Sequence, residues 1–144
     1  MLIAIQFIAA MSTTLFAGAS IYINFVEHPA RMGCDTKTAV TVWAPSYKRA
    51  TIMQASLALL GLLSGFTVWL LIGDVRWLVG AVCIGLVVPF TFIGIMPTNR
   101  LLLAPGRDLS SSDTRALLVK WGKLHAVRSV LSFIASVIYL GLLV

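Results

Sequence analysis

Two histidines, each followed three positions later by an arginine, are the residues of this sequence best suited to chemistry. His28 precedes Arg31, and His125 precedes Arg128. A neutral imidazole can take up or release a proton near neutral pH, and a guanidinium can stabilise an anionic oxygen such as that of an enolate. The two pairs indicate proton abstraction from a weakly acidic substrate, with His28 and His125 as the candidate catalytic residues.

Hydrogen-bonding and aromatic side chains accompany these pairs. Asn24 stands four positions before His28, and Trp121 four before His125, so each shares a helix face with its histidine. Amides can orient a carbonyl group, and tryptophan and tyrosine rings can face a flat aromatic ligand. We expect all of them to converge on one pocket for an amphipathic molecule. The candidate substrate-binding residues are Asn24, Arg31, Trp43, Tyr47, Gln54, Asn99, Trp121 and Arg128.

Each of these residues also has a simpler structural explanation. Arginines at the ends of membrane helices extend their charge toward water, and interfacial tryptophans anchor a helix at the lipid headgroups. A single histidine at such a position often only makes a hydrogen bond. A catalytic site and a set of structural edge residues are therefore both open interpretations of the pattern.

A metal site is the less favoured interpretation of the same residues. Glu27, His28 and His125 have the composition of a two-histidine, one-carboxylate site. However, Glu27 and His28 are adjacent, so on a helix their side chains point about 100° apart. Cys34 and Cys83 lie in different predicted segments, too far apart to form a disulfide. The sequence therefore predicts no metal and no other cofactor, with a metal site as the alternative.

The composition excludes most soluble classes of protein. Of 144 residues, 59% are hydrophobic and 11% are charged, and the mean hydropathy is +0.96. Soluble domains usually carry about 25% charged residues. The sequence pI is near 9.9, but in so apolar a chain the basic surplus is typical of membrane topology, and no nucleic-acid partner is expected.

Four apolar runs cover residues 1–26, 52–72, 77–96 and about 124–144. Each has roughly 20 residues or more, enough for a helix to cross a hydrocarbon core about 30 Å thick. None shows the alternation of a membrane strand. The sequence therefore predicts an all-α fold, a four-helix transmembrane bundle in the lipid bilayer, as a single domain over residues 1–144.

The basic residues are concentrated in the segments 27–51 and 98–123, whereas the opposite side holds Arg76 alone. The positive-inside rule then places both segments in the cytoplasm and both termini outside. We expect each cytoplasmic loop to contain an amphipathic helical segment. In the first, Pro45 suits a first helical turn; in the second, Ser112 or Asp113 suits a helix N-cap, with the last helix beginning near Thr114.

Within the spans, packing features are the only other signals. Gly61 and Gly65 form a GxxxG pair, which offers a contact for a homodimer. Pro89 is expected to kink the third helix.

Four short motifs together resemble one known family. They are FAGASIYINFVEHPARM at 16–32, WAPSYKRATIMQ at 43–54, PTNRLL at 97–102 and WGKLHAVRS at 121–129. In order and spacing they resemble the anthrone oxygenase-like membrane family over nearly the whole chain. Carried over by position, the polar motif of that family falls on His28, Pro29, Arg31, Pro97, Asn99, Trp121, His125 and Arg128.

The resemblance implies oxidation of an anthrone to an anthraquinone by molecular oxygen. A base such as His28 or His125 would form the anthrolate, and Arg128 or Asn99 would stabilise its oxygen. The electron-rich carbanion could then react with oxygen directly, without a flavin, haem or metal.

Two other functions are compatible with the same sequence. One is a non-catalytic membrane protein that binds a quinone-like small molecule or a lipid, or supports a partner protein. The other is a small four-helix exporter, which needs a carboxylate inside the membrane for proton coupling. The apolar runs contain no Asp or Glu, which disfavours the exporter.

Overall fold

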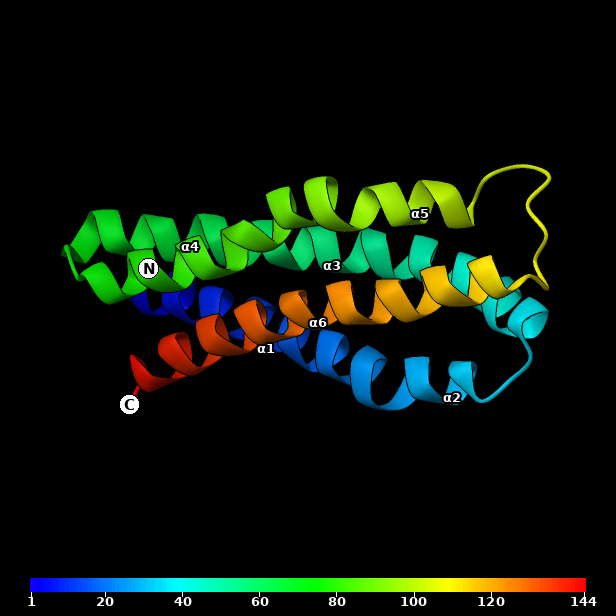
Figure 1. Ribbon diagram of the computed structural model, residues 1–144. Coiled ribbons are helices and arrows are strands. Elements are labelled where there is room, and N and C mark those ends of the chain that lie inside the picture. Colours follow the sequence, from blue (N-terminus) through cyan, green and yellow to red (C-terminus); the bar gives the residue numbers. More distant parts are fainter.

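The computed structural model describes all residues from Met1 to Val144 and consists of helices and connecting loops. The first long rod joins three helices end to end, and the third does the same; the second and fourth rods are single helices (Figure 1). All four rods are long and apolar enough to cross a membrane. The predicted four-helix bundle is therefore confirmed. The elements are α1 (Leu2–Tyr22), η1 (Ile23–Glu27), α2 (His28–Met32), α3 (Thr36–Ile72), α4 (Val75–Phe90), η2 (Thr91–Ile95), α5 (Met96–Leu102) and α6 (Ser112–Gly141).

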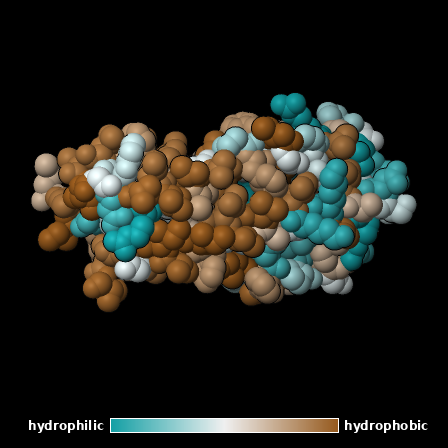
Figure 2. Space-filling view, turned by 60° about the vertical axis from the view of Figure 1, so that its left-hand side comes forward, coloured by the Kyte–Doolittle hydropathy of each residue, from teal (hydrophilic) through white to brown (hydrophobic).

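The two ends of the bundle differ in character. Both termini and the turn between α3 and α4 lie at one end, and the connections 33–35 and 103–111 lie at the other, here called the loop end (Figure 1). Hydrophilic residues gather at the loop end, whereas hydrophobic residues cover most of the rest of the visible surface (Figure 2). The predicted grouping of the two basic segments is thus present in the fold. Which side of a membrane the loop end faces stays a prediction.

The predicted first loop, residues 27–51, is wrong in its bounds because most of it is helical. Residues 27–32 continue the first rod, and α3 begins at Thr36. Asp35 caps this start: its carboxylate accepts hydrogen bonds from the Thr38 hydroxyl at 2.6 Å and the Thr38 N–H at 3.0 Å. These bonds lower the pKa of Asp35. The amphipathic segment is therefore the beginning of a membrane helix, and Pro45 lies inside α3 rather than in a first turn.

The predicted second loop, residues 98–123, is also shorter than expected. The third rod continues through α5 to Leu102, and α6 begins at Ser112. The N-cap is Ser111, whose hydroxyl accepts a hydrogen bond from the Thr114 N–H at 3.2 Å, rather than Ser112 or Asp113. Residues 110–112 are all serines, so a helix start shifted by one residue would have the same kind of N-cap. The sequence pattern therefore could not select among them.

Two five-residue π-helical segments interrupt the first and third rods. Each precedes a proline at the second position of the next helix, Pro29 after η1 and Pro97 after η2. A proline lacks the N–H of a regular helix, and its ring crowds the carbonyl four residues before it. The wider π turn accommodates that carbonyl. The distortion expected at Pro89 therefore occurs after it, in η2.

The GxxxG pair lies inside the bundle. A Cβ at Gly61 would meet the side chains of Thr13 and Ser12, and one at Gly65 would meet the ring of Tyr139. These glycines let α3 pack closely against α1 and α6. The contact proposed for a homodimer is thus used within one chain, and self-association stays a prediction without an assigned surface.

Candidate functional site

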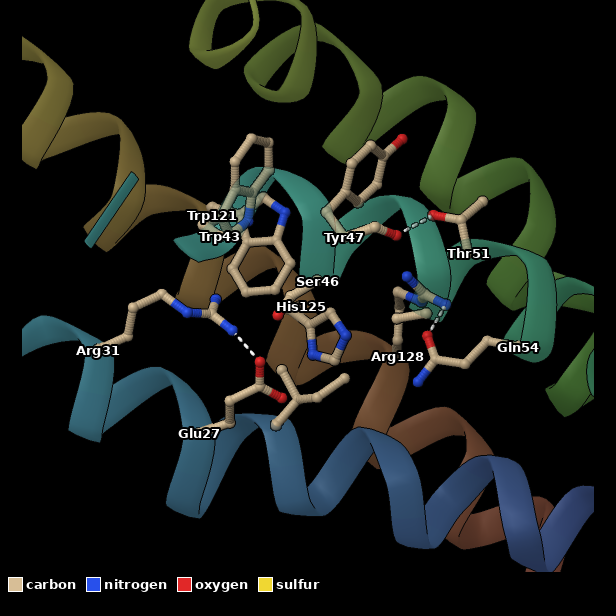
Figure 3. A pocket seen from close by; sticks show the side chains of 12 residues that line it. Glu27, Arg31, Trp43, Ser46, Tyr47, Thr51, Gln54, Trp121, His125 and Arg128 are labelled. Carbon is tan, nitrogen blue, oxygen red and sulfur yellow. Dashed lines mark hydrogen bonds and ion pairs between the residues drawn. The ribbon is translucent and has the colours of Figure 1, made fainter. Parts of the chain in front are cut away.

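A small polar cavity of about 30 Å³ lies near the loop end, between the first, second and fourth rods (Figure 3). Seven of the ten predicted site residues line it, together with five that were not predicted as catalytic or substrate-binding residues. The predicted ones are Arg31, Trp43, Tyr47, Gln54, Trp121, His125 and Arg128. The others are Ile23, Glu27, Ser46, Ala50 and Thr51. The third rod contributes nothing to this wall, contrary to the expectation that Asn99 reaches the pocket.

His125 is held in one tautomer by its neighbours. Its Nδ1 lies 2.7 Å from Oδ1 of Asn24, which also accepts a hydrogen bond from the Ser129 hydroxyl at 2.6 Å. The amide nitrogen of Asn24 donates to the Gly122 carbonyl at 3.0 Å, which fixes the orientation of the amide. Because Oδ1 can only accept, Nδ1 of a neutral His125 carries the hydrogen. The unprotonated nitrogen is then Nε2, the one available to take up a proton.

Arg128 is a buried cation with no acidic partner. It donates to Oε1 of Gln54 at 2.7 Å, and Gln54 in turn donates to the Ser20 hydroxyl at 3.3 Å. Its guanidinium lies 5.4 Å above the ring of Phe16, and its Nε has no hydrogen-bond partner. The two ion pairs of the chain, Arg31–Glu27 and Arg76–Asp74, do not include it. A buried, unneutralised guanidinium with spare donors is suited to bind an anionic oxygen.

Arg31 is the second cation of the cavity, but it is already neutralised. It forms an ion pair with Glu27, one helical turn earlier, and both side chains face the cavity (Figure 3). An anionic ligand therefore meets a stronger positive potential at Arg128 than at Arg31.

Three aromatic residues form one wall of the cavity. Trp43 stacks on Tyr47, with ring centres 5.2 Å apart and planes 6° apart, and meets Trp121 edge-on at 5.8 Å. Trp121 also stacks on His125 at 4.8 Å. The indole nitrogens of both tryptophans are buried without hydrogen-bond partners. The wall is aromatic and mostly apolar, and both indole N–H groups are free to donate.

His28 is not part of the cavity wall. It is buried, its ring centre lies 5.2 Å from that of Trp121, and Gly122 lies against it so closely that a Cβ there would be 2.5 Å from Nε2. Trp121 thus contacts both histidines, and only His125 faces the cavity. The expected convergence of the two histidines on one pocket is wrong in this respect.

Asn99 lies in α5, buried, with no hydrogen-bond partner for either atom of its amide. Asn24 also lies outside the cavity lining, but it contacts the site through His125. No three His, Cys, Asp or Glu side chains come together in a group that could hold a metal ion. The prediction that no cofactor is needed stays a prediction.

A second cavity, here called the apolar chamber, adjoins the first. It has a volume of about 100 Å³ and lies between α1, α3, α6 and the third rod. It shares four lining residues with the polar cavity. These are Tyr47, Thr51, Gln54 and Arg128.

Comparison with known proteins identifies the family of this sequence. The model of the anthrone oxygenase family matches residues 43–138, from the aromatic wall on α3 to the last turns of α6. This chain belongs to the anthrone oxygenase family. The match includes six of the cavity residues predicted from the sequence, and Arg31 lies before it.

Two fungal anthrone oxygenases are similar to this member of the family. One, from Cryptosporiopsis sp. (strain 8999), is 28% identical over 139 residues, covering 90% of this chain and 80% of its own length. Another, from Aspergillus fumigatus, is 39% identical over 54 residues, covering 35% of this chain and 34% of its own. No solved structure matches the chain.

Three cavity residues of α3 were not predicted in this member of the anthrone oxygenase family: Ser46, Ala50 and Thr51. The sequence does contain a pattern that indicates them. Trp43, Ser46, Tyr47, Ala50, Thr51 and Gln54 all line the cavity and follow the three- and four-residue spacing of a single helix face. Interpreting residues 27–51 as a loop concealed this periodicity. Read as one helix, the segment would have predicted Ser46 and Thr51 as well.

Proposed function

We propose that this protein is a membrane-embedded oxygenase that converts an anthrone, or a similar flat phenolic ketone, to the corresponding quinone with molecular oxygen. One observation carries the proposal. His125 with a free Nε2 and Arg128 without an acidic partner lie one turn apart on α6 and line the same cavity. A proton acceptor beside an unneutralised cation is the arrangement that enolate formation requires. Membership of the anthrone oxygenase family supports the same activity.

The lining of the cavity suits a flat amphipathic substrate. The cavity of about 30 Å³ is smaller than a typical small-molecule site, and the adjoining chamber of about 100 Å³ extends the space for the ligand. The aromatic rings of Trp43, Tyr47 and Trp121 offer apolar ring surface for contact with an aromatic ligand. In the proposed complex the ketone oxygen faces Arg128, and the methylene carbon opposite it faces Nε2 of His125.

The proposed reaction balances without an external reductant. Nε2 of His125 removes a methylene proton, and the negative charge spreads to the ketone oxygen, where Arg128 stabilises it. The carbanion forms a carbon–oxygen bond with O₂ and gives a hydroperoxide, which takes a proton. Loss of water, with removal of the second methylene proton, leaves a carbonyl group. The methylene carbon supplies all four electrons; one oxygen atom enters the quinone and the other leaves as water.

We further propose that the site faces the cytoplasm. The loop end contains the segments that carry nine of the eleven basic residues of the chain, and Arg76 lies at the opposite end. This charge distribution fits the positive-inside rule. The substrate would then be oxidised near the cytoplasmic surface of the membrane.

The test is oxygen consumption by purified protein with anthrone as substrate, corrected for spontaneous oxidation. His125→Ala is expected to lower turnover about 10²–10⁴-fold, the usual contribution of a general base. Lys123→Ala, which changes an exposed residue of the same helix, is the control and keeps the wild-type rate. One O₂ is consumed per quinone formed, and a chelator leaves the rate unchanged.

Two results would overturn the proposal. Wild-type turnover in folded His125→Ala would remove the assigned base. Wild-type protein that binds anthraquinone but consumes no oxygen with anthrone would instead favour a non-catalytic small-molecule-binding protein.

A further inference from the structure

The two cavities meet at a boundary that is polar on one side and apolar on the other. Figure 3 shows Tyr47, Thr51, Gln54 and Arg128 together on one side of the polar cavity, away from the Arg31–Glu27 pair. The same four residues line the apolar chamber. A ligand long enough to cross this boundary would have one part among charged and hydrogen-bonding groups and another part among hydrocarbon.

Away from that boundary the chamber offers no free polar group. Its lining there consists of Phe16, Ala55, Ala58, Val87, Val88, Thr91, Phe92 and Met96. The single hydroxyl among them, on Thr91, donates to the Val87 carbonyl at 2.7 Å. Such a lining cannot compensate the desolvation of a polar ligand, but it gains free energy when it covers apolar surface.

The chamber opens toward the apolar outer surface of the bundle. Ala55 on α3 and Phe92 in η2 both line it and are both exposed, Phe92 by 63%. In a membrane these positions face lipid, in which fused-ring compounds concentrate. The π turn η2, one side of this opening, departs from regular helix geometry at the same place.

Arg128 fixes which end of a ligand belongs at the boundary. Its guanidinium lies 5.4 Å above the ring of Phe16, a fully buried residue that lines the chamber. An anionic or carbonyl oxygen placed at Arg128 therefore leaves the rest of a flat molecule beside hydrocarbon. Only a ligand with a polar edge and an apolar body satisfies both sides.

We propose that the apolar chamber is a ring-binding subsite, which holds a lateral aromatic ring of a fused-ring ketone that enters from the lipid between α3 and η2. The inference rests on the proposed function for the identity of the ligand. It adds that ring size and apolar substituents are selected by Ala55, Val88 and Phe92, at a distance from the groups that react.

The experiment narrows the chamber with a larger side chain and measures the affinity for a fused-ring ligand. Ala55→Leu places a larger side chain in the lining, and Ser56→Leu adds the same side chain to an exposed neighbour outside it. The affinity for anthraquinone, measured by quenching of tryptophan fluorescence, is expected to fall about tenfold or more in Ala55→Leu, as for a steric mismatch in an apolar pocket. Ser56→Leu is expected to bind as the wild type does. Val88→Phe is a second variant with the same expected loss.

The outcomes separate the two proposals. Wild-type protein that binds anthraquinone, loses affinity in both chamber variants and never oxidises anthrone would support the subsite and remove the oxygenase. Unchanged affinity in folded Ala55→Leu and Val88→Phe would overturn the subsite even if oxygen is consumed. Wild-type protein that does not bind anthraquinone would overturn it as well.

Discussion

Asn24 determines which nitrogen of His125 can act as a base. Its amide oxygen accepts from Nδ1 and its amide nitrogen is held by the Gly122 carbonyl, so the proton on His125 is directed away from the cavity. The sequence predicted Asn24 as a substrate-binding residue. Its contacts instead indicate a positioning residue, which acts through His125 and leaves Nε2 free.

Asn24→Leu is expected to lower kcat on the order of 10–100-fold, the usual loss when the hydrogen-bond partner that orients a functional histidine is removed. Asn24→Asp keeps an acceptor at the same place and should retain more of the rate. KM should change little in both, because Asn24 does not line the cavity. Equal losses in both variants, or an effect confined to KM, would contradict the positioning role. Steady-state kinetics on anthrone make the measurement.

Residue spacing predicted the site residues best where their helix is regular. His125, Arg128 and Trp121 lie on the uninterrupted α6, and their three- and four-residue spacing correctly placed them together. The prediction that Asn24 and His28 share one helix face assumed the same regularity. The π turn η1 precedes His28, which packs behind Trp121 instead of facing the cavity.

At the scale of the helices, four apolar runs were sufficient to predict four membrane rods, because length and hydropathy decide that question. The helix ends were not predictable in the same way. Residues 36–51 carry charges and a proline, features that resemble a loop, yet the Asp35 cap and the aromatic face keep them helical. Trp43 also packs against Trp121 and Tyr47 against Met96, and such tertiary contacts cannot be seen in a single sequence.

The packing of α3 against α6 gives a stability prediction. Gly65→Ala is expected to destabilise the protein by about 1–3 kcal/mol, because the added methyl group would overlap Tyr139. Tyr139 cannot easily move aside, since it is fully buried, stacks on Trp77 at 5.0 Å and donates to the Gly61 carbonyl at 3.3 Å. Thermal unfolding in detergent, followed by circular dichroism, measures the effect.

Gly18→Ala is the matched control for this prediction. A Cβ at Gly18 meets nothing within 4 Å, so the same change should be neutral or stabilising by up to about 1 kcal/mol through helix propensity. If both variants unfold at the same temperature, the contact between residue 65 and Tyr139 does not exclude a larger side chain at that position.

At the scale of the whole molecule, the charge asymmetry predicts an orientation in the membrane, and a native cysteine can test it. Cys34 is exposed in the connection 33–35 at the loop end, whereas Cys83 lies half-buried within α4. A membrane-impermeant thiol reagent should therefore label Cys34 only after cells are permeabilised. In a Cys34→Ser background, Val144→Cys reports the opposite end and should be labelled in intact cells. The reverse pattern would place the site outside the cell.

The two π turns have a consequence for changes in chain length. A flexible loop can accommodate an insertion or deletion without moving its neighbours. In contrast, η1 and η2 are each continuous with helices on both sides. Loss of one residue from 23–27 would restore the regular α-helical period and rotate the remainder of the first rod, residues 28–32, by about 100°. The Glu27–Arg31 pair would then turn away from the cavity while every residue of α6 stayed in place. These ten residues thus set the angular alignment of the bundle, and there the number of residues matters more than their identity.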